Sequence, residues 1–210
     1  MEQLRVQLQG SMFMRILWLY GLFTLFSNAA YLVAYYWLPE GFMRGSPQAA
    51  AARIASKPDE FWSEFGLTLF FNLGVMSLII LLSNFSQVRG FPAAYLIPIF
   101  LGITGGLVTG SNSFIADDLD RYSSVREAIA LGLTIGEIEM LGYILMIAAT
   151  VKFGVYQYKS WWRWSGEWKP VKVMRIRDVR LSKAEIICLG AGFLFLIIAA
   201  YRETVMAMSL

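Results

Sequence analysis

Five long apolar stretches, separated by shorter polar connections, dominate the hydrophobic pattern of the chain. Each is long enough to cross a bilayer core of roughly 30 Å, which takes about 20 helical residues. Backbone groups in lipid must be paired within their own segment, so helices are expected throughout. The pattern therefore predicts an all-α, polytopic transmembrane helix bundle. The five expected spans are 12–38, 61–83, 91–114, 128–151 and 184–206.

The first apolar stretch also has features of a signal peptide, because Arg5 and Arg15 stand at its start. Its apolar region is about twice the usual length for a signal peptide, and it lacks a convincing small-residue cleavage site. We therefore expect a retained anchor. The chain then divides into 1–60, with this anchor and an outer amphipathic connection, and 61–210, a four-span helical bundle.

The composition supports a membrane protein and removes several kinds of chemistry. Only 16% of the residues are charged and 57% are hydrophobic, whereas about a quarter of a soluble domain is charged. The chain has no histidine and one cysteine, Cys188, which excludes imidazole metal sites, histidine-based triads and internal disulfides. Neither a phosphate-binding loop nor a dinucleotide fingerprint is present. We expect no enzyme activity, no metal and no cofactor.

Loop charges predict the orientation of the bundle. With the N-terminus inside, twelve of the 18 basic residues fall in inner segments, as the positive-inside rule requires. Most of them lie in the connection 152–183. The outer loop after the third span instead carries Asp117, Asp118 and Asp120. The expected topology is N-in and C-out.

The inner connection 152–183 combines tryptophans with basic side chains. This composition is typical of a cytoplasmic segment lying in the lipid headgroup region. Basic and aromatic clusters also occur in nucleic-acid-binding proteins, but beside two spans we favour membrane lipids as the partner and expect no nucleic acid. Residues 171–179 alternate apolar and polar side chains, which hints at a short surface strand. The expected interface residues are Trp161, Trp162, Trp164, Trp168, Lys159 and Arg163.

A glycine stripe marks the third span. Gly102, Gly106 and Gly110 recur every fourth residue and so share one helix face, where another helix can approach to backbone contact. The partner helix belongs either to the same chain or to a second copy in a homodimer. Pro98 is expected to kink this span about two turns from its start.

Glu137 and Glu139 lie about ten residues from the outer end of the fourth span. At about 1.5 Å per residue this is roughly 15 Å deep, near the bilayer centre. A charge there costs at least about 2.5–3.5 kcal/mol on insertion scales. Two residues on a helix turn through about 200°, so the carboxyl groups point to opposite sides. Gly136 is expected to assist helix packing and makes a local break conceivable.

Other polar residues are expected at the same depth. Asn72 is the midpoint of the second span, Thr104 lies near that of the third, and Tyr143 follows Glu139 by one turn. We expect Glu139, Asn72, Thr104 and Tyr143 to form a polar cluster, with Glu137 as a further candidate. It either forms an ion, proton or small-solute site or holds the bundle in register through hydrogen bonds of about a kilocalorie each.

Glu203 lies near the outer end of the last span, next to Arg202. Straight helices would leave it a dozen or more ångströms from Glu139. The expected role of Arg202 and Glu203 is an end cap or a local ion pair, although a re-entrant helix would bring the two glutamates closer.

Three segments resemble the stage II sporulation protein M family of integral membrane proteins. FFNLGVMSLIILLS resembles the asparagine-bearing span and places Asn72; IGEIEMLGYILMIAATVKFG resembles the HGxxE segment and places Gly136 and Glu139. IIAAYRETVMAM resembles the closing helix and places Glu203. The match covers roughly residues 61–208, and Ile135 replaces the usual histidine. The resemblance implies a multi-pass protein of a prokaryotic cell membrane that acts with protein partners.

Two functions follow from these observations. The first is a non-enzymatic membrane scaffold or complex subunit, which predicts a dry interior and protein partners in the membrane. The alternative is a transporter or channel subunit that uses the midplane glutamate to move an ion, a proton or a small solute. The scaffold is favoured here, because five spans show no inverted repeat of the kind common in transporters.

Overall fold

The computed structural model describes residues 10–46, 60–113, 125–160 and 168–208; at 125–135 and 207 it describes the backbone alone. The fold is mainly helical. Its long helices coincide with the five expected stretches, and one of them changes type along its length. They are α2 (Met12–Trp37), α4 (Phe61–Leu69) continued by the π-helix η1 (Phe70–Met76) and α5 (Ser77–Asn84), α6 (Leu96–Gly110), α7 (Val125–Thr150) and α8 (Lys183–Ala207).

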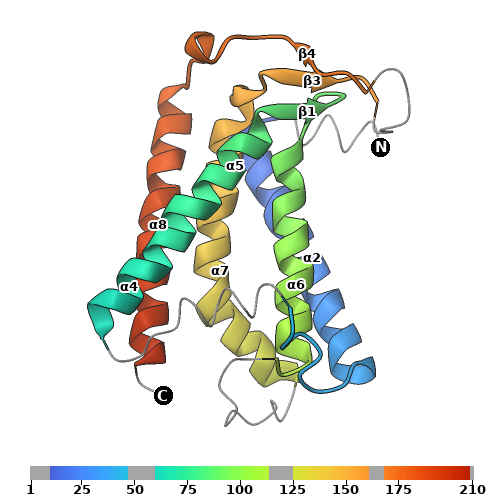
Figure 1. Cartoon of the computed structure of the whole chain (residues 1–210), viewed down its shortest axis with the longest axis vertical. Helices are drawn as coiled ribbons and strands as arrows, with labels where there is room; N and C mark the ends of the chain where they lie inside the picture. Colours follow the sequence, from blue (N-terminus) through green and yellow to red (C-terminus); the bar gives the residue numbers. More distant parts are fainter. Residues whose placement is uncertain (1–9, 47–59, 114–124, 161–167, 209–210) are drawn as a thin grey trace.

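The helices form a bundle in which α7 occupies the centre (Figure 1). The pair α2 and α6 packs on one side of α7, α8 packs on the other, and α4, η1 and α5 run diagonally across. The core lies where α2, α5 and α8 meet the second half of α7; Leu19, Ile80 and Leu196 are fully buried there. The second half of the central helix is therefore covered by protein, while the outer helices present apolar surface.

Four helices are long and apolar enough to cross a membrane. They cover Met12–Trp37, Phe61–Asn84, Ala93–Gly110 and Lys183–Met206. Within the described residues α7 does not meet the same criterion, although it has 26 residues. The four helices indicate an integral membrane protein.

The glycine stripe of α6 packs against α2 of the same chain. A Cβ atom on Gly106 would lie 2.3 Å from the Ser27 carbonyl oxygen, and one on Gly110 would lie 2.4 Å from that of Tyr31. Gly102 meets the Phe23 carbonyl oxygen in the same way, at 2.8 Å. The stripe is thus a backbone-contact seam within one chain, which answers the question left open by the sequence.

A second glycine contact joins α7 to α8. A Cβ atom on Gly142 would lie 2.8 Å from a Leu196 methyl carbon, and one on Gly192 would lie 2.8 Å from Met146 Cγ. Because these approaches leave no room for side chains, they fix the register between the two antiparallel helices. Gly142 lies level with Leu196.

The prediction of an all-α fold was wrong in one respect, because a small sheet covers one end of the bundle. Its strands are β1 (Ser86–Val88), β2 (Phe91–Pro92), β3 (Tyr156–Tyr158) and β4 (Val171–Lys172), in the order β2-β1-β3-β4. Strands β1 and β3 pair in parallel, and the other two pairs are antiparallel. Strand β4 lies within the alternating segment 171–179, where the sequence hinted at a strand.

Local chemistry explains both the sheet and the start of α6. Arg89 and Gly90 both adopt positive φ between β1 and β2, as a two-residue hairpin turn requires. The expected kink at Pro98 was misplaced, because α6 begins at Leu96 after a 3-10 turn at Ala93–Tyr95. Pro98 therefore stands in the first helical turn, where a missing N–H costs little.

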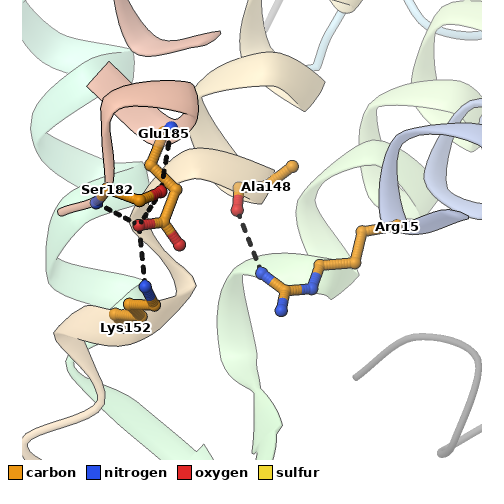
Figure 2. Close-up of polar contacts among 5 residues, drawn as sticks. All are labelled: Arg15, Ala148, Lys152, Ser182 and Glu185. Atoms are coloured by element: carbon orange, nitrogen blue, oxygen red, sulfur yellow. Dashed lines mark hydrogen bonds and ion pairs between the residues drawn. The ribbon is translucent and has the colours of Figure 1, made fainter. Parts of the chain in front are cut away.

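The start of α8 carries a complete capping box. The Ser182 hydroxyl accepts a hydrogen bond from the Glu185 backbone N–H, and the Glu185 carboxylate accepts one from the Ser182 backbone N–H. Figure 2 shows Lys152 reaching the same carboxylate, with Nζ 2.9 Å from Glu185 Oε2. This contact ties the end of α7 to the beginning of α8.

Candidate functional site

Glu139 and Tyr143 form the centre of the candidate site on α7. The Tyr143 hydroxyl donates a hydrogen bond of 2.6 Å to Glu139 Oε1, as their one-turn spacing predicts. Tyr143 is 2% exposed, and Glu139 is partly buried beside it. The sequence thus placed these two side chains correctly.

Glu203 on α8 approaches the same place. Gly142 of α7 and Leu196 of α8 lie at the same level of the bundle. Toward the end opposite the sheet, Glu139 follows three residues from Gly142 along α7, and Glu203 follows seven residues from Leu196 along α8. At 1.5 Å per residue, the two are offset along the bundle by only about 6 Å. Their carboxyl groups are close enough to interact electrostatically. From the sequence we expected an end cap or a local ion pair for Glu203, because the sequence alone does not give the register between the two helices.

Glu64 is the third carboxyl group of the site and comes from α4. It is 4% exposed, and its Oε2 atom is buried without a hydrogen-bond partner. It lies close enough to Glu203 to interact electrostatically, on a helix held to α8 by contacts of Phe61 and Phe65 with Tyr201. We name Glu64, Glu139 and Glu203 the acidic cluster.

The acidic cluster has no compensating cation in the described part of the chain. No ion pair joins Glu64, Glu139 or Glu203 to a basic side chain there. Arg202, expected to pair with Glu203, does not do so. If all three carboxyl groups were ionised, their negative charges would repel one another, because the protein interior screens charge more weakly than water does. Among the described residues, the three carboxyl groups thus lie near one another without a basic ion-pair partner.

The carboxyl groups of the acidic cluster do not converge on one point. Within the described residues, no group of three or more acidic or cysteine side chains lies close enough to hold a metal. The carboxyl groups thus interact through their charge without forming one coordination shell.

The acidic cluster is open on one side and closed on the other. Glu203 is exposed at the bundle surface, about 6 Å from the end of α8. On the sheet side of Glu139 the next turns of α7 are sealed, with Ile144, Met146 and Ile147 all at 0% exposure. The exposed part of the cluster therefore lies at the end opposite the sheet.

Asn72 lies on the π-helix η1, and no hydrogen bond joins it to the acidic cluster among the described residues. Its Nδ2 atom is buried without a hydrogen-bond partner, so it does not bond to Glu139. A π-helix interrupts regular backbone bonding and is frequent at functional sites. An unsatisfied amide in such a segment is a donor available to water or a moving carboxyl group.

Two other expected members lie elsewhere. The Thr104 hydroxyl donates to the Phe100 and Leu101 carbonyl oxygens of its own helix, because α6 turns its glycine face to α2. Glu137 accepts a hydrogen bond from the Tyr20 hydroxyl of α2. The 200° rotation between Glu137 and Glu139 thus holds, and the two carboxyl groups serve different helix contacts.

The remaining expected positions give a mixed result. Gly136 was expected to pack against a helix, but nothing lies within 4 Å of the Cβ it lacks, and it is exposed. Trp168 is tilted against Tyr158 of β3 with ring centroids 4.8 Å apart, and Lys159 is exposed. Trp161, Trp162, Arg163 and Trp164 lie outside the described residues.

Glu64 is the functional candidate that sequence reasoning missed. It stands in the first turn of an apolar helix, where acidic side chains are ordinary because they complement the helix dipole. The sequence did hold one sign that Glu64 is buried. It lies three residues after Phe61 and four before Thr68, and residues at these spacings share one side of a helix. Thr68 is also buried, at 9% exposure.

Comparison with known proteins adds no assignment: no family model matches the chain, and no curated protein or solved structure matches it significantly.

Proposed function

We propose that the chain is a multi-pass membrane protein that moves protons through the acidic cluster, as a transporter or channel subunit. The observation that carries this proposal is the meeting of Glu64, Glu139 and Glu203 from three helices without a basic partner among the described residues. A structural role needs one hydrogen-bonded carboxyl group. Three that repel one another raise the cost of the fold, which is typical of a functional site.

A pathway follows from the order of the three groups. Glu203 is the exposed entrance, Glu64 is buried beside it, and Glu139 lies deepest with Tyr143 as its hydrogen-bond donor. The packed half of α7 closes the route toward the sheet. This arrangement is a half-pathway, and transfer to the other side requires the helices around α7 to move.

The proposed topology has five spans, with the N-terminus and the sheet inside and the C-terminus outside. The sheet end carries Lys152, Lys172 and Arg180 from the described part of the connection 152–183, and basic residues are retained on the inner side. Helix α7 then counts as the fifth span, sheltered by its neighbours. The half-pathway would open to the outside of a prokaryotic plasma membrane, the location that the resemblance to the stage II sporulation protein M family implies.

Proton flux into liposomes tests the proposal. Purified protein is reconstituted into liposomes containing a pH-sensitive dye, and an inward proton flux is driven by a potassium diffusion potential. The wild type should acidify the interior at least tenfold faster than protein-free liposomes. Glu139→Gln removes the titrating group but keeps the hydrogen-bond acceptor for Tyr143, so the flux should fall to the background.

Glu137→Gln is the matched control, because it removes the same charge two residues away on another face of α7. It should retain most of the flux. Unchanged flux in Glu139→Gln, or a wild type indistinguishable from empty liposomes, would contradict the proposal.

A non-enzymatic scaffold is the second candidate, and the sealed core favours it. Every residue of α7 from Tyr143 to Thr150 except the half-buried Leu145 is buried, with exposures of 0–2%, which gives a packed centre on which partner proteins could assemble. The resemblance to the sporulation protein family points to the same role. A scaffold predicts no flux in the wild type, together with copurification of membrane partners that Glu139→Gln does not disrupt.

A further inference from the structure

An open pocket at the sheet end is separate from the acidic cluster. It has a volume of about 490 Å³ and is bounded by the start of α2, the end of α7, the sheet and the chain before α8. Small-molecule sites have volumes of this order. The pocket therefore has room for a group larger than a single ion.

The lining of the pocket is cationic. Arg15, Lys152 and Arg180 line it, together with the amides of Gln87 and Gln157, and no acidic side chain is among its described lining residues. Amide nitrogens add hydrogen-bond donors that suit an anion. The pocket thus concentrates positive charge in an otherwise apolar protein.

The three basic groups differ in how far the protein already neutralises them. Lys152 is paired with Glu185 at 2.9 Å, so its charge is largely compensated. Arg15 donates from one terminal nitrogen to the Ala148 carbonyl oxygen at 3.4 Å, as Figure 2 shows. Its Nε atom is buried and has no hydrogen-bond partner.

Arg180 supplies the second uncompensated charge. Its side chain is exposed and forms no ion pair within the described residues. Two guanidinium groups present planar sets of donors that match the oxygens of a phosphate group.

We propose that this pocket binds a phosphate group, carried either by the headgroup of an anionic phospholipid or by a soluble phosphate ester. The pocket lies where helices α2 and α8 begin and α7 ends, which is the depth of lipid phosphates in a bilayer. A lipid bound there would contact α2, α7 and α8 together.

Native mass spectrometry of the delipidated protein in detergent tests the proposal. The protein is titrated in separate arms with phosphatidylglycerol, zwitterionic phosphatidylcholine and soluble glycerol 3-phosphate. Phosphatidylglycerol should bind at least tenfold more tightly than phosphatidylcholine. Arg180→Gln should weaken that binding about fivefold, the factor for one basic group near an anionic surface, and should leave folding intact because Arg180 is exposed and unpaired.

Arg177→Gln is the matched control, because it removes one positive charge three residues away, at an exposed position outside the pocket lining. It should bind phosphatidylglycerol as the wild type does. Binding of glycerol 3-phosphate that is also weakened by Arg180→Gln supports a soluble phosphate ester, and binding of phosphatidylglycerol alone supports a lipid headgroup. The proposal is overturned if neither ligand binds, or if both variants lose affinity equally.

Discussion

Neighbouring glycines on α6 differ in what surrounds them. Gly106 faces the α2 backbone, where an added Cβ would lie 2.3 Å from the Ser27 carbonyl oxygen and 2.9 Å from the Tyr31 nitrogen. Gly105 has nothing within 4 Å of the same position. The backbone atoms around Gly106 cannot rotate away as a side chain could. Its lack of a side chain is therefore needed for packing.

Gly106→Ala should destabilise the protein by roughly 1–3 kcal/mol, the usual cost of overpacking a well-packed contact. The added methyl group has to push α2 away from α6 along the whole seam. Reversible unfolding in mixed micelles measures the loss of free energy.

Gly105→Ala is the control for helix propensity, since it adds the same methyl group at an open position one residue away. It should be neutral or stabilising by up to about 1 kcal/mol. Equal losses in the two variants would show that the α2–α6 contact is looser than described.

Sequence reasoning at the residue scale succeeded where spacing along one helix decides the outcome. The Glu139–Tyr143 hydrogen bond and the opposite orientation of Glu137 both follow from 3.6 residues per turn. Sequence reasoning failed for Thr104 and Glu203, because their neighbours depend on how a second helix is rotated or in what register it packs. Those depend on tertiary packing that no single segment encodes.

At the scale of elements, the start of α8 is fixed by local chemistry. Ser182 and Glu185 form the reciprocal capping box, and Lys152 adds an ion pair from the end of α7. These contacts satisfy backbone N–H groups that a helix start otherwise leaves unpaired. The first turn of α8 is thereby held to the end of α7.

Ser182→Ala should cost about 1 kcal/mol, because it removes the side chain that accepts from the Glu185 backbone N–H. The effect should be local, with amide hydrogen exchange about fivefold faster in the first turn of α8. Exchange measured by mass spectrometry after proteolysis resolves this turn.

Ser83→Ala serves as the comparison, because Ser83 stands near the end of α5 and its hydroxyl forms no capping contact among the described residues. Only its backbone carbonyl oxygen accepts from the Phe85 N–H, and the substitution keeps that group. Exchange in the first turn of α8 should remain unchanged in this variant. Unaltered exchange in Ser182→Ala would show that the ion pair with Lys152 alone holds the turn.

The positions of the helices could be predicted from the sequence, but the interruptions and the sheet could not. The length of each apolar stretch determines where a helix forms, and each helix agrees with its expected stretch to within a few residues. The π-helix η1 depends on how α4 and α5 separately pack against α8 and α7. The strands have two or three residues each and are too short to leave a periodic signal.

At the scale of the whole molecule, the chain passes back and forth between two chemically distinct ends. One end carries the sheet, the capping box of α8 and the cationic pocket. The other carries the connection after α2, where the Asn112 side chain donates to Glu40 at 2.6 Å, and the entrance at Glu203. The proposed orientation rests on this difference in charge between the two ends.

Cysteine labelling in intact cells should reveal that orientation. In a Cys188→Ala background, Gly45→Cys at the end opposite the sheet should react with a membrane-impermeant maleimide. Lys172→Cys on β4 should react only after permeabilisation. Both positions are exposed, so the bilayer alone accounts for a difference in labelling.

The Cys188→Ala background without a new cysteine is the control and should remain unlabelled. The reverse pattern, with Lys172→Cys labelled in intact cells, would place the sheet outside and contradict the proposed topology.

The small sheet has a mechanical consequence. By pairing β1 with β3, and β3 with β4, it fastens the ends of α5, α7 and α8 to one another. At the far end, α4 and α8 are held by ring contacts around Tyr201, which slide more readily than a hydrogen-bonded ladder. The helices are thus joined more firmly at the sheet than at the opposite end, where Glu64 and Glu203 lie. Any separation of the helices should therefore be largest around these two carboxyl groups.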